Sequence, residues 1–329
     1  MPSSQSTTRA KIVVTGGRGQ LGRAIAARLG GAYDVVPLGR ADLDVGDQRA
    51  AHDAIAAAAP AIVIHAAAMT DVDGCERDPD AAFRTNALGA LYVAEAAEAA
   101  GARLLAISTD FVFDGDRPSQ YFEYDAPRPL SVYGASKLAG EEHVLRVARG
   151  ALVVRTAWLY GPGGKNFVDT ILALGEANAG APLKVVADQA GSPTWAPDLA
   201  DALARLLSSP LSGVVHAANA GHATRYELAR RALDLAGGES VRVEPVTTAE
   251  MPRPARRPAH AVLGSRVFGA AGIAPLRDWE DALADHIAAR AAAGSVAPAG
   301  SSATGTAGAP GGASVSRAPG NPSAKAPAS

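Results

Sequence analysis

The sequence predicts an α/β protein with a Rossmann-like, doubly wound parallel sheet and a smaller C-terminal α/β substrate lobe. Three observations predict this class. A short β-branched run at residues 11–15 leads into a glycine-rich turn and then a helical pattern. Apolar, strand-like runs then alternate with helical segments up to about residue 160. Beyond that point the strand-like runs are short and lie among helices and Pro-rich loops, which indicates a second lobe.

The first element is a strand–turn–helix unit that is typical of dinucleotide binding. Lys11–Thr15 reads as a strand, and the helix after the turn places Leu21, Ile25 and Leu29 on one face. Between them, glycines recur with the spacing G-x-x-G-x-x-G, which permits a tight turn and brings a pyrophosphate close to the helix N-terminus. We therefore expect this loop to bind a dinucleotide cofactor through Gly16, Gly19, Gln20, Leu21 and Gly22.

The end of the second strand, Tyr33–Leu38, bears on which cofactor binds. Arg40 stands where an acidic residue would hold the ribose 2′-hydroxyl of NAD, and an arginine there suits the 2′-phosphate of NADP. Arg18, inside the glycine loop, is placed to assist Arg40 in binding this phosphate. Asp42 and Asp44 follow closely, so a carboxylate contact to the ribose, as in NAD-binding proteins, stays open as an alternative. We expect NADPH, with NADH possible.

Three further runs read as buried parallel strands, at 61–65, 103–108 and 151–155, with one alanine-rich helix from Asn86 to Ala100. Short strands follow at 183–186, 214–216 and 241–246. A last helix begins near Trp279, with Leu283 and Ile287 on the same face. The predicted organisation is a disordered N-terminus at 1–9, a mainly NAD(P)-binding domain at 10–160, a mainly substrate-binding lobe at 161–291, and a disordered low-complexity tail at 292–329.

Tyr133 and Lys137 are the residues that indicate a reaction. They stand at i and i+4 at the start of a helix, so they share one helical face. An ammonium beside a phenol favours the phenolate, so we expect Lys137 to lower the pKa of Tyr133. Such a phenol acts as general acid when a carbonyl is reduced. Thr109, or its neighbour Ser108, ends a predicted strand and offers a hydroxyl to the carbonyl oxygen.

Composition excludes several classes of partner. The 329 residues are 48% apolar, which suffices for a large core, and the net charge of −2 offers no basic field for nucleic acid. Cys75 is the only cysteine, which rules out an internal disulfide and fits a reducing compartment. The first nine residues are polar, and no apolar run approaches the length of a membrane span. We expect a cytoplasmic protein with no membrane association.

Several longer strings resemble one family. The glycine loop and the Thr109, Tyr133 and Lys137 set resemble an extended short-chain dehydrogenase/reductase. Over about residues 10–290 the chain is similar to the dTDP-4-dehydrorhamnose reductase family in particular. The strings that carry this resemblance are His65-Ala-Ala-Ala-Met-Thr-Asp-Val-Asp73, Ser108-Thr-Asp-Phe-Val-Phe-Asp-Gly115, Pro129-Leu-Ser-Val-Tyr-Gly134, Arg155-Thr-Ala-Trp-Leu-Tyr160, Asp188-Gln-Ala-Gly-Ser-Pro-Thr194 and Arg257-Pro258.

The resemblance implies reduction of the 4-keto group of dTDP-4-dehydro-L-rhamnose to dTDP-L-rhamnose by NADPH or NADH, a step of dTDP-rhamnose biosynthesis. Tyr133 would supply the proton, Lys137 would also hold the nicotinamide ribose, and Thr109 would bind the carbonyl oxygen. Further cofactor contacts are expected at Asp44, Val45, Ala66, Ala67 and Ala68. Substrate contacts are expected at Val72, Thr109, Asp110, Phe111, Trp158, Asn166, Gln189 and Arg257.

Two positions depart from what many relatives have. Phe111 stands where they carry a tyrosine, so one hydroxyl contact to the sugar would be lost and sugar selectivity loosened. Some relatives bind magnesium at a dimer interface through a glutamate of the first helix. Ala24 occupies that position, so we predict no such metal, while a homodimer remains possible.

Two other functions fit the same residues. One is another nucleotide-sugar enzyme of the superfamily, such as a 4-reductase for a different sugar or a 4-epimerase, which would recycle its cofactor. The other is a non-catalytic regulatory subunit, because the regulatory subunit of methionine adenosyltransferase resembles this family. An intact Thr109, Tyr133 and Lys137 set argues against a purely regulatory role.

Overall fold

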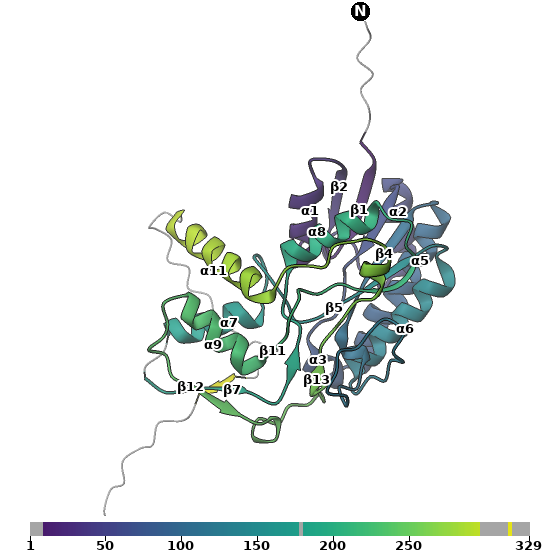
Figure 1. The fold of residues 1–329 in the computed structure, drawn as a ribbon. Coiled ribbons are helices and arrows are strands. Elements are labelled where there is room, and N and C mark those ends of the chain that lie inside the picture. Colours follow the sequence, from purple (N-terminus) through teal and green to yellow (C-terminus); the bar gives the residue numbers. More distant parts are fainter. Residues whose placement is uncertain (1–8, 178–179, 297–314, 318–329) are drawn as a thin grey trace, which may run out of the picture.

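The structure is a computed structural model, and it describes residues 9–177, 180–296 and 315–317. Residues 1–8, most of the N-terminal segment predicted to be disordered, lie outside the described residues. The described chain forms a large sheet with helices on both faces and a smaller lobe beside it (Figure 1).

The described part of the chain contains a six-stranded sheet in which all neighbouring strands run parallel. This sheet confirms the predicted Rossmann-like fold class. Its strands carry near-continuous apolar residues because helices cover both faces. In spatial order they are β10 (Gly213–His216), β5 (Leu152–Thr156), β4 (Arg103–Thr109), β3 (Ile62–His65), β1 (Lys11–Thr15) and β2 (Asp34–Leu38).

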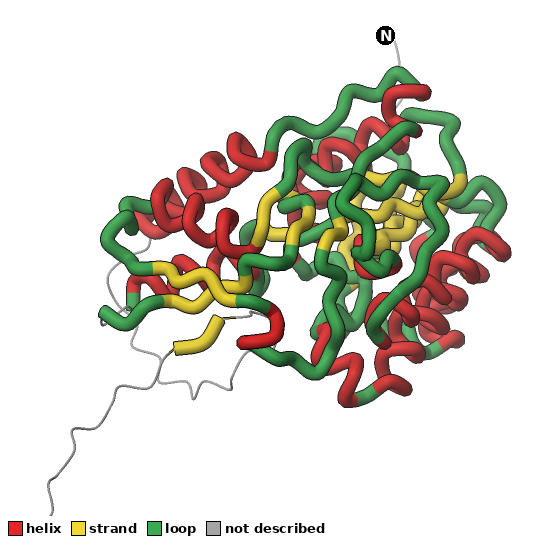
Figure 2. Tube along the Cα trace, turned by 60° about the horizontal axis from the view of Figure 1, so that its bottom comes forward, coloured by secondary structure: helices red, strands yellow, loops and turns green. Residues whose placement is uncertain are grey.

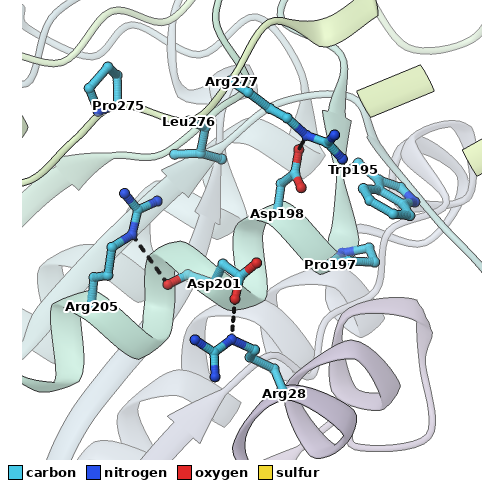
Figure 3. A pocket seen from close by; sticks show the side chains of 9 residues that line it. All are labelled: Arg28, Trp195, Pro197, Asp198, Asp201, Arg205, Pro275, Leu276 and Arg277. Atoms are coloured by element: carbon cyan, nitrogen blue, oxygen red, sulfur yellow. Dashed lines mark hydrogen bonds and ion pairs between the residues drawn. The ribbon is translucent and has the colours of Figure 1, made fainter. Parts of the chain in front are cut away.

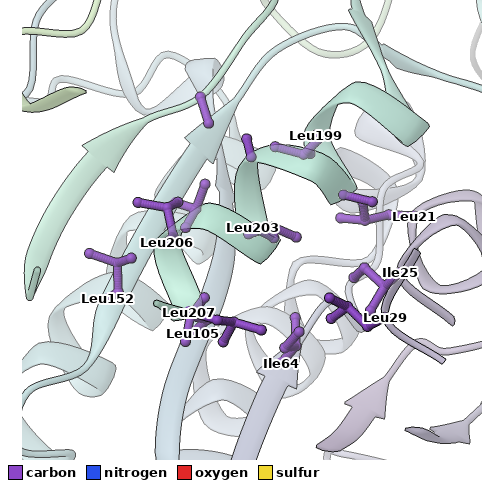
Figure 4. Packing of buried hydrophobic residues seen from close by; sticks show 14 of the residues in the cluster. Leu21, Ile25, Leu29, Ile64, Leu105, Leu152, Leu199, Leu203, Leu206 and Leu207 are labelled. Atoms are coloured by element: carbon purple, nitrogen blue, oxygen red, sulfur yellow. The ribbon is translucent and has the colours of Figure 1, made fainter. Parts of the chain in front are cut away.

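Two groups of helices sandwich the sheet (Figure 1). On one face α1 (Gln20–Leu29) packs against α8 (Ala196–Leu207), and their leucines meet strand residues such as Leu105 and Leu152 in one buried cluster (Figure 4). On the other face lie α2 (Gln48–Ala58), α5 (Gly89–Ala99) and α6 (Val132–Val147). Small alanine side chains of α2 and α5, and Gly140 of α6, let these helices pack closely.

The predicted alanine-rich helix is interrupted at its start. The chain forms α3 (Val72–Arg77), α4 (Pro79–Phe83) and a π-helical turn (Arg84–Leu88) before α5 begins at Gly89. Asn86 lies in that π turn rather than in a regular helix, and its side chain is fully buried. Such turns are rare and often accompany functional sites.

The smaller lobe has its own core, built around Leu172, Leu183, Leu228 and Leu283. It contains α7 (Phe167–Glu176), α9 (Arg225–Leu235), α11 (Trp279–Val296), β7 (Leu183–Val186) and β12 (Val243–Val246), which group together in both views (Figures 1 and 2). The remaining short elements are β6 (Leu159–Tyr160), which pairs with β9 (Thr194–Trp195); β8 (Ala190–Gly191), which pairs with β11 (Ala223–Thr224) and β13 (His260–Ala261); and η2 (Asp110–Val112), η3 (Thr248–Glu250) and α10 (Val267–Ala270).

The structure differs from the sequence-based expectation in two boundaries. The strand expected at 214–216 belongs to the large sheet, as β10 beside β5, and α8 covers a face of that sheet. Two elements from the C-terminal half of the chain are therefore part of the nucleotide-binding domain. Helix α11 extends to Val296, past the expected tail start at 292, because the alanines at 291–293 are strong helix formers. Residues 315–317 of that tail form β14 (Val315–Arg317), antiparallel to β7. No described helix combines the length and apolar character that crossing a bilayer requires.

Candidate active site

The glycine loop forms a cradle between β1 and α1. Gly16 has φ +67°, and a Cβ there would lie 2.7 Å from the carbonyl oxygen of Ala66. A Cβ on Gly22 would overlap the backbone of Gly17, so the helix can only pack this closely without a side chain. Gly19 offers no side-chain cap to α1, which leaves backbone N–H groups of its first turn available for an anion. The loop therefore fits a pyrophosphate.

Charged residues gather beyond the end of β2. Arg18 donates from Nε and Nη2 to the Asp42 carboxylate, at 3.0 Å each, and Asp42 also accepts from the Gly39 N–H at 2.8 Å. The Gly39 N–H and Arg18 hold the pKa of Asp42 below its usual value. Arg40 is exposed, and its charge acts on Asp44. Since Asp42 is neutralised by Arg18, Arg40 is the cation best placed here for a phosphate.

Two of the expected cofactor contacts, Asp44 and Val45, also interact within the protein. Asp44 forms an ion pair with Arg84 at 3.0 Å, and this contact lowers the pKa of Asp44. Val45 is buried, and a Cβ on Gly89 would lie 2.9 Å from its Cγ2, so its side chain belongs to the core.

A buried asparagine shapes the loop after β3, which contains the three half-buried residues Ala66, Ala67 and Ala68. Asn86 accepts from the Met69 N–H at 2.8 Å and donates to the Met69 oxygen at 3.1 Å and to Ser136 Oγ at 3.0 Å. It therefore ties this loop to the helix that carries Tyr133. Sequence reasoning missed Asn86, although a lone amide within an alanine-rich segment was a signal.

Thr109 and Tyr133 come together at the carboxyl end of the sheet, where open α/β sheets place their sites. Thr109 ends β4, and Tyr133 lies in the first turn of α6, which Ser131 caps. The Thr109 hydroxyl is a hydrogen-bonding neighbour of the Tyr133 phenol. It also donates to Asp110 Oδ1 at 3.0 Å and accepts from the Phe111 N–H at 3.2 Å. A carbonyl oxygen entering here would meet both hydroxyl groups.

Lys137 lies deeper than a surface lysine, on the same face of α6 as Tyr133. Its Nζ donates to the Ile107 carbonyl at 2.8 Å. Burial lowers the pKa of Lys137 to about 8, while the Glu141 carboxylate raises it. His65 and Ser108 line a small cavity beside it, and burial together with the Lys137 charge lowers the pKa of His65 to about 3. His65 is therefore neutral at physiological pH.

The phenol of Tyr133 does not behave as the sequence predicted. Its pKa is raised, chiefly by burial and further by Asp110 and Cys75, while the Thr109 hydroxyl lowers it. The expectation that Lys137 lowers this pKa is wrong for this arrangement, because burial of the phenol dominates the shift and Lys137, whose Nζ donates to the Ile107 carbonyl, is not among the groups that lower it. Tyr133 is thus held as a protonated phenol, the form that a proton donor needs.

Asp110 and Phe111 complete the surroundings of the phenol. Asp110 is buried, its Oδ2 has no hydrogen-bond partner among the described residues, and burial raises its pKa to about 7. The Phe111 ring meets the Tyr133 ring edge-on, with centroids 5.3 Å apart, and Val72 packs into the same small cluster. Together with Thr109, four of the expected substrate residues therefore lie around Tyr133.

Trp158 lies just after β5 in an unusual conformation. Its φ of +45° is rare for a bulky side chain, and such strain concentrates at functional sites. A Cβ on Gly191 would overlap the indole, so that glycine makes room for the ring. The Arg225 guanidinium lies over the indole, 3.5 Å from the ring centroid. One face of Trp158 is therefore covered by a cation that sequence reasoning missed entirely.

The three remaining expected substrate residues have partners within the protein. Asn166 caps α7, accepting from the Asp169 N–H at 2.8 Å and donating to Gln20 Oε1 at 3.1 Å. Gln189 is buried and donates to Thr248 Oγ1 at 3.0 Å. Arg257 forms an ion pair with the buried Asp73 at 3.1 Å. Arg257 is the only one of these three with a charge that could bind an anionic part of a substrate.

The chain is similar to proteins of known function. The family model described as RmlD substrate binding domain matches residues 10–291. The chain belongs to this family. A dTDP-4-dehydrorhamnose reductase from Mycobacterium tuberculosis is 43% identical over 290 residues, covering 85% of this chain and 93% of that protein. A solved structure of dTDP-4-dehydrorhamnose reductase from Bacillus anthracis, in complex with NADP, is 37% identical with a TM-score of 0.83, covering 85% of this chain and 99% of that one.

Relatives within the family do not all share one sugar. A probable dTDP-4,6-dihydroxy-2-methyloxan-3-one 4-ketoreductase from Streptomyces antibioticus is also 43% identical, over 274 residues, covering 82% of this chain and 92% of that protein. Membership in the RmlD family confirms the resemblance drawn from the motifs, while the sugar is a separate question.

A surface hollow of about 570 Å³ lies away from these residues, against the outer side of α8 (Figure 3). Its charged groups are engaged with one another: Arg28 pairs with Asp201, and Arg277 pairs with Asp198 at 2.9 Å. It contains none of the expected site residues, so the chemistry is assigned to the Tyr133 region.

Proposed function

We propose that this protein reduces the 4-keto group of dTDP-4-dehydro-L-rhamnose to give dTDP-L-rhamnose, with NADPH as the preferred reductant and NADH as a possible one. The observation that carries the proposal is the meeting of Thr109, Tyr133 and Lys137 at the carboxyl edge of the sheet. The glycine cradle, and the NADP bound to the Bacillus anthracis relative, support the cofactor.

The residues divide the work of the reaction. When bound, the reduced nicotinamide supplies a hydride to C4 of the sugar. Tyr133 donates its phenolic proton to the C4 oxygen, where negative charge develops. The Thr109 hydroxyl turns from Asp110 toward the same oxygen and stabilises that charge. Lys137, whose Nζ donates to the Ile107 carbonyl and does not lower the pKa of Tyr133, is assigned to the nicotinamide ribose.

Arg40 supports NADPH over NADH. It is exposed beyond β2, while the competing carboxylate of Asp42 is neutralised by Arg18. A ribose 2′-hydroxyl would thus find no free carboxylate at Asp42, whereas a 2′-phosphate would meet a cation. We expect Arg40→Ala to raise the KM for NADPH more than the KM for NADH.

A coupled assay tests the reaction directly. Purified protein is given dTDP-4-dehydrorhamnose with NADPH or NADH, and cofactor oxidation is compared with sugar reduction. We expect one NADPH oxidised for each sugar reduced. Sugar conversion without net cofactor oxidation would instead identify a 4-epimerase, and cofactor binding without any turnover would identify a regulatory subunit.

Sugar selectivity needs its own comparison, because the Streptomyces antibioticus relative carries a different name. We expect dTDP-4-dehydrorhamnose to have a higher kcat/KM than other 4-keto-6-deoxy sugar nucleotides. Phe111→Tyr restores the hydroxyl that many relatives carry beside Tyr133. We expect this variant to sharpen that preference without altering NADPH binding.

A further inference from the structure

Arg225 is a cation in an unusual place. It is the first residue of α9, and its N–H donates to the Gln189 oxygen at 3.2 Å, which fixes the backbone. The partly buried side chain carries its guanidinium carbon 3.5 Å from the centroid of Trp158 and 5.0 Å from that of Phe167. Two aromatic rings therefore hold the guanidinium in one orientation.

The hydrogen-bonding capacity of Arg225 is left unused. Among residues 9–177, 180–296 and 315–317, its guanidinium has no ion pair and no hydrogen bond. Two other arginines with little exposure have carboxylate partners: Arg155 pairs with Glu141, whereas Arg257 shares the single carboxylate of Asp73 with Arg253. Burial accordingly lowers the pKa of Arg225 to about 9. Aromatic faces position a guanidinium but do not satisfy its five N–H donors.

The charges that act on Arg225 locate it within the site. Asp110, next to Thr109, attracts its charge, and Arg257 repels it. Arg225 thus lies within electrostatic reach of both Asp110, which follows the end of β4, and Arg257. Two cations that approach each other are stabilised together by a ligand with more than one negative charge. Asp110 offsets this charge only in part, because burial raises its own pKa to about 7.

We propose that Arg225 binds the diphosphate of the substrate, with its planar fork directed at phosphate oxygens by Trp158 and Phe167. This rests on the proposed function, because a nucleotide sugar carries its diphosphate between the base and the reacting sugar. The guanidinium suits this group, since its parallel N–H donors match two phosphate oxygens. Trp158 then acts partly through Arg225, by holding it, rather than only by packing on the sugar.

Equilibrium binding of dTDP and of thymidine separates the diphosphate contact from the rest. We expect Arg225→Gln to weaken dTDP binding by about 10- to 100-fold, the range for a lost charged hydrogen bond, and to leave thymidine binding unchanged. The matched control is Arg231→Gln on the same helix, whose side chain pairs with Glu280 at the surface. We expect that variant to bind dTDP like the wild type.

Steady-state kinetics and a second variant complete the test. Arg225→Gln should raise the KM for the sugar nucleotide by a larger factor than it lowers kcat. Arg225→Lys keeps the charge and the stem, so it should recover part of the dTDP affinity, and it replaces the glutamine variant if that protein does not fold. Equal dTDP affinity in wild type and Arg225→Gln, or equal losses for dTDP and thymidine, would overturn the proposal.

The outcome is separable from that of the proposed function. If the wild type binds dTDP through Arg225 but reduces no 4-keto sugar, the reaction is wrong and the diphosphate contact stands. If the reaction proceeds and Arg225→Gln binds dTDP normally, the contact is wrong and the reaction stands. A wild-type protein with no affinity for dTDP would overturn both.

Discussion

Replacing Lys137 by methionine should make the protein more stable while abolishing its activity. Burial lowers the pKa of Lys137 from 10.5 to about 8, and this difference corresponds to a penalty of about 3 kcal/mol on the charged form in the folded state. Lys137→Met removes that penalty but also the hydrogen bond to the Ile107 oxygen, worth about 1 kcal/mol, and leaves that oxygen unpaired. The expected net gain in unfolding free energy at pH 7 is about 1–2 kcal/mol.

The stability difference between Lys137→Met and the wild type depends on pH. Below about pH 8 the lysine is protonated in both folded and unfolded states, so the wild type carries the full penalty. Above pH 8 the folded state loses this proton while the unfolded state keeps it up to about pH 10.5, so the wild type recovers stability. The advantage of Lys137→Met should therefore shrink by about 1.4 kcal/mol per pH unit between pH 8 and pH 10.

Urea unfolding followed by circular dichroism, without cofactor, measures both quantities. Lys11→Met is the matched control, because Lys11 also donates to a carbonyl, that of Ala58 at 2.7 Å, but is only half-buried. We expect no gain for the control. The reasoning is refuted if Lys137→Met is less stable than the wild type at pH 7, or if its advantage does not change between pH 7 and pH 10.

Three other variants test the site and its support. Tyr133→Phe removes the proton donor and should lower turnover by about 10²- to 10⁴-fold while NADPH binding, followed by fluorescence, is retained; unchanged turnover would refute its role. Glu141→Gln leaves Arg155 without its carboxylate in a site where both side chains are 4% exposed. It should lower the unfolding free energy by about 3–5 kcal/mol in urea, and a loss below about 1 kcal/mol would contradict this. Gly22→Ala places a methyl group against the loop backbone and should weaken NADPH binding at least tenfold, whereas Gly31→Ala, with open space around it, should change nothing.

The elements that the sequence predicted well are those specified by neighbouring residues. The strand at 11–15, the glycine turn and the helix after it depend on local spacing, and each lies where the pattern indicated. The i and i+4 placement of Tyr133 and Lys137 followed from helix geometry alone. Membership of β10 in the large sheet did not follow, because it depends on pairing with β5 some 60 residues earlier in the chain.

The site was harder to predict where burial decides the chemistry. Sequence spacing placed the ammonium beside the phenol but gave no measure of desolvation, which dominates the pKa of both Lys137 and Tyr133. Nothing in the sequence was a reason to select Arg225, which follows a helix-capping threonine. Its contact with Trp158, 67 residues earlier in the chain, exists only in the folded structure. Nor did the sequence indicate that the Asn166 amide caps α7 and donates to Gln20.

The position of β10 has a consequence for how the protein acquires its fold during synthesis. The sheet's edge beside β5 stays open until residues 213–216 have left the ribosome, and α8, which covers one face, emerges only shortly before them. A nascent chain of 160 residues would therefore expose both a strand edge and the apolar side chains that α8 later covers. We expect the nucleotide-binding half to become protease-resistant only after residues 213–216 of the C-terminal half have been synthesised.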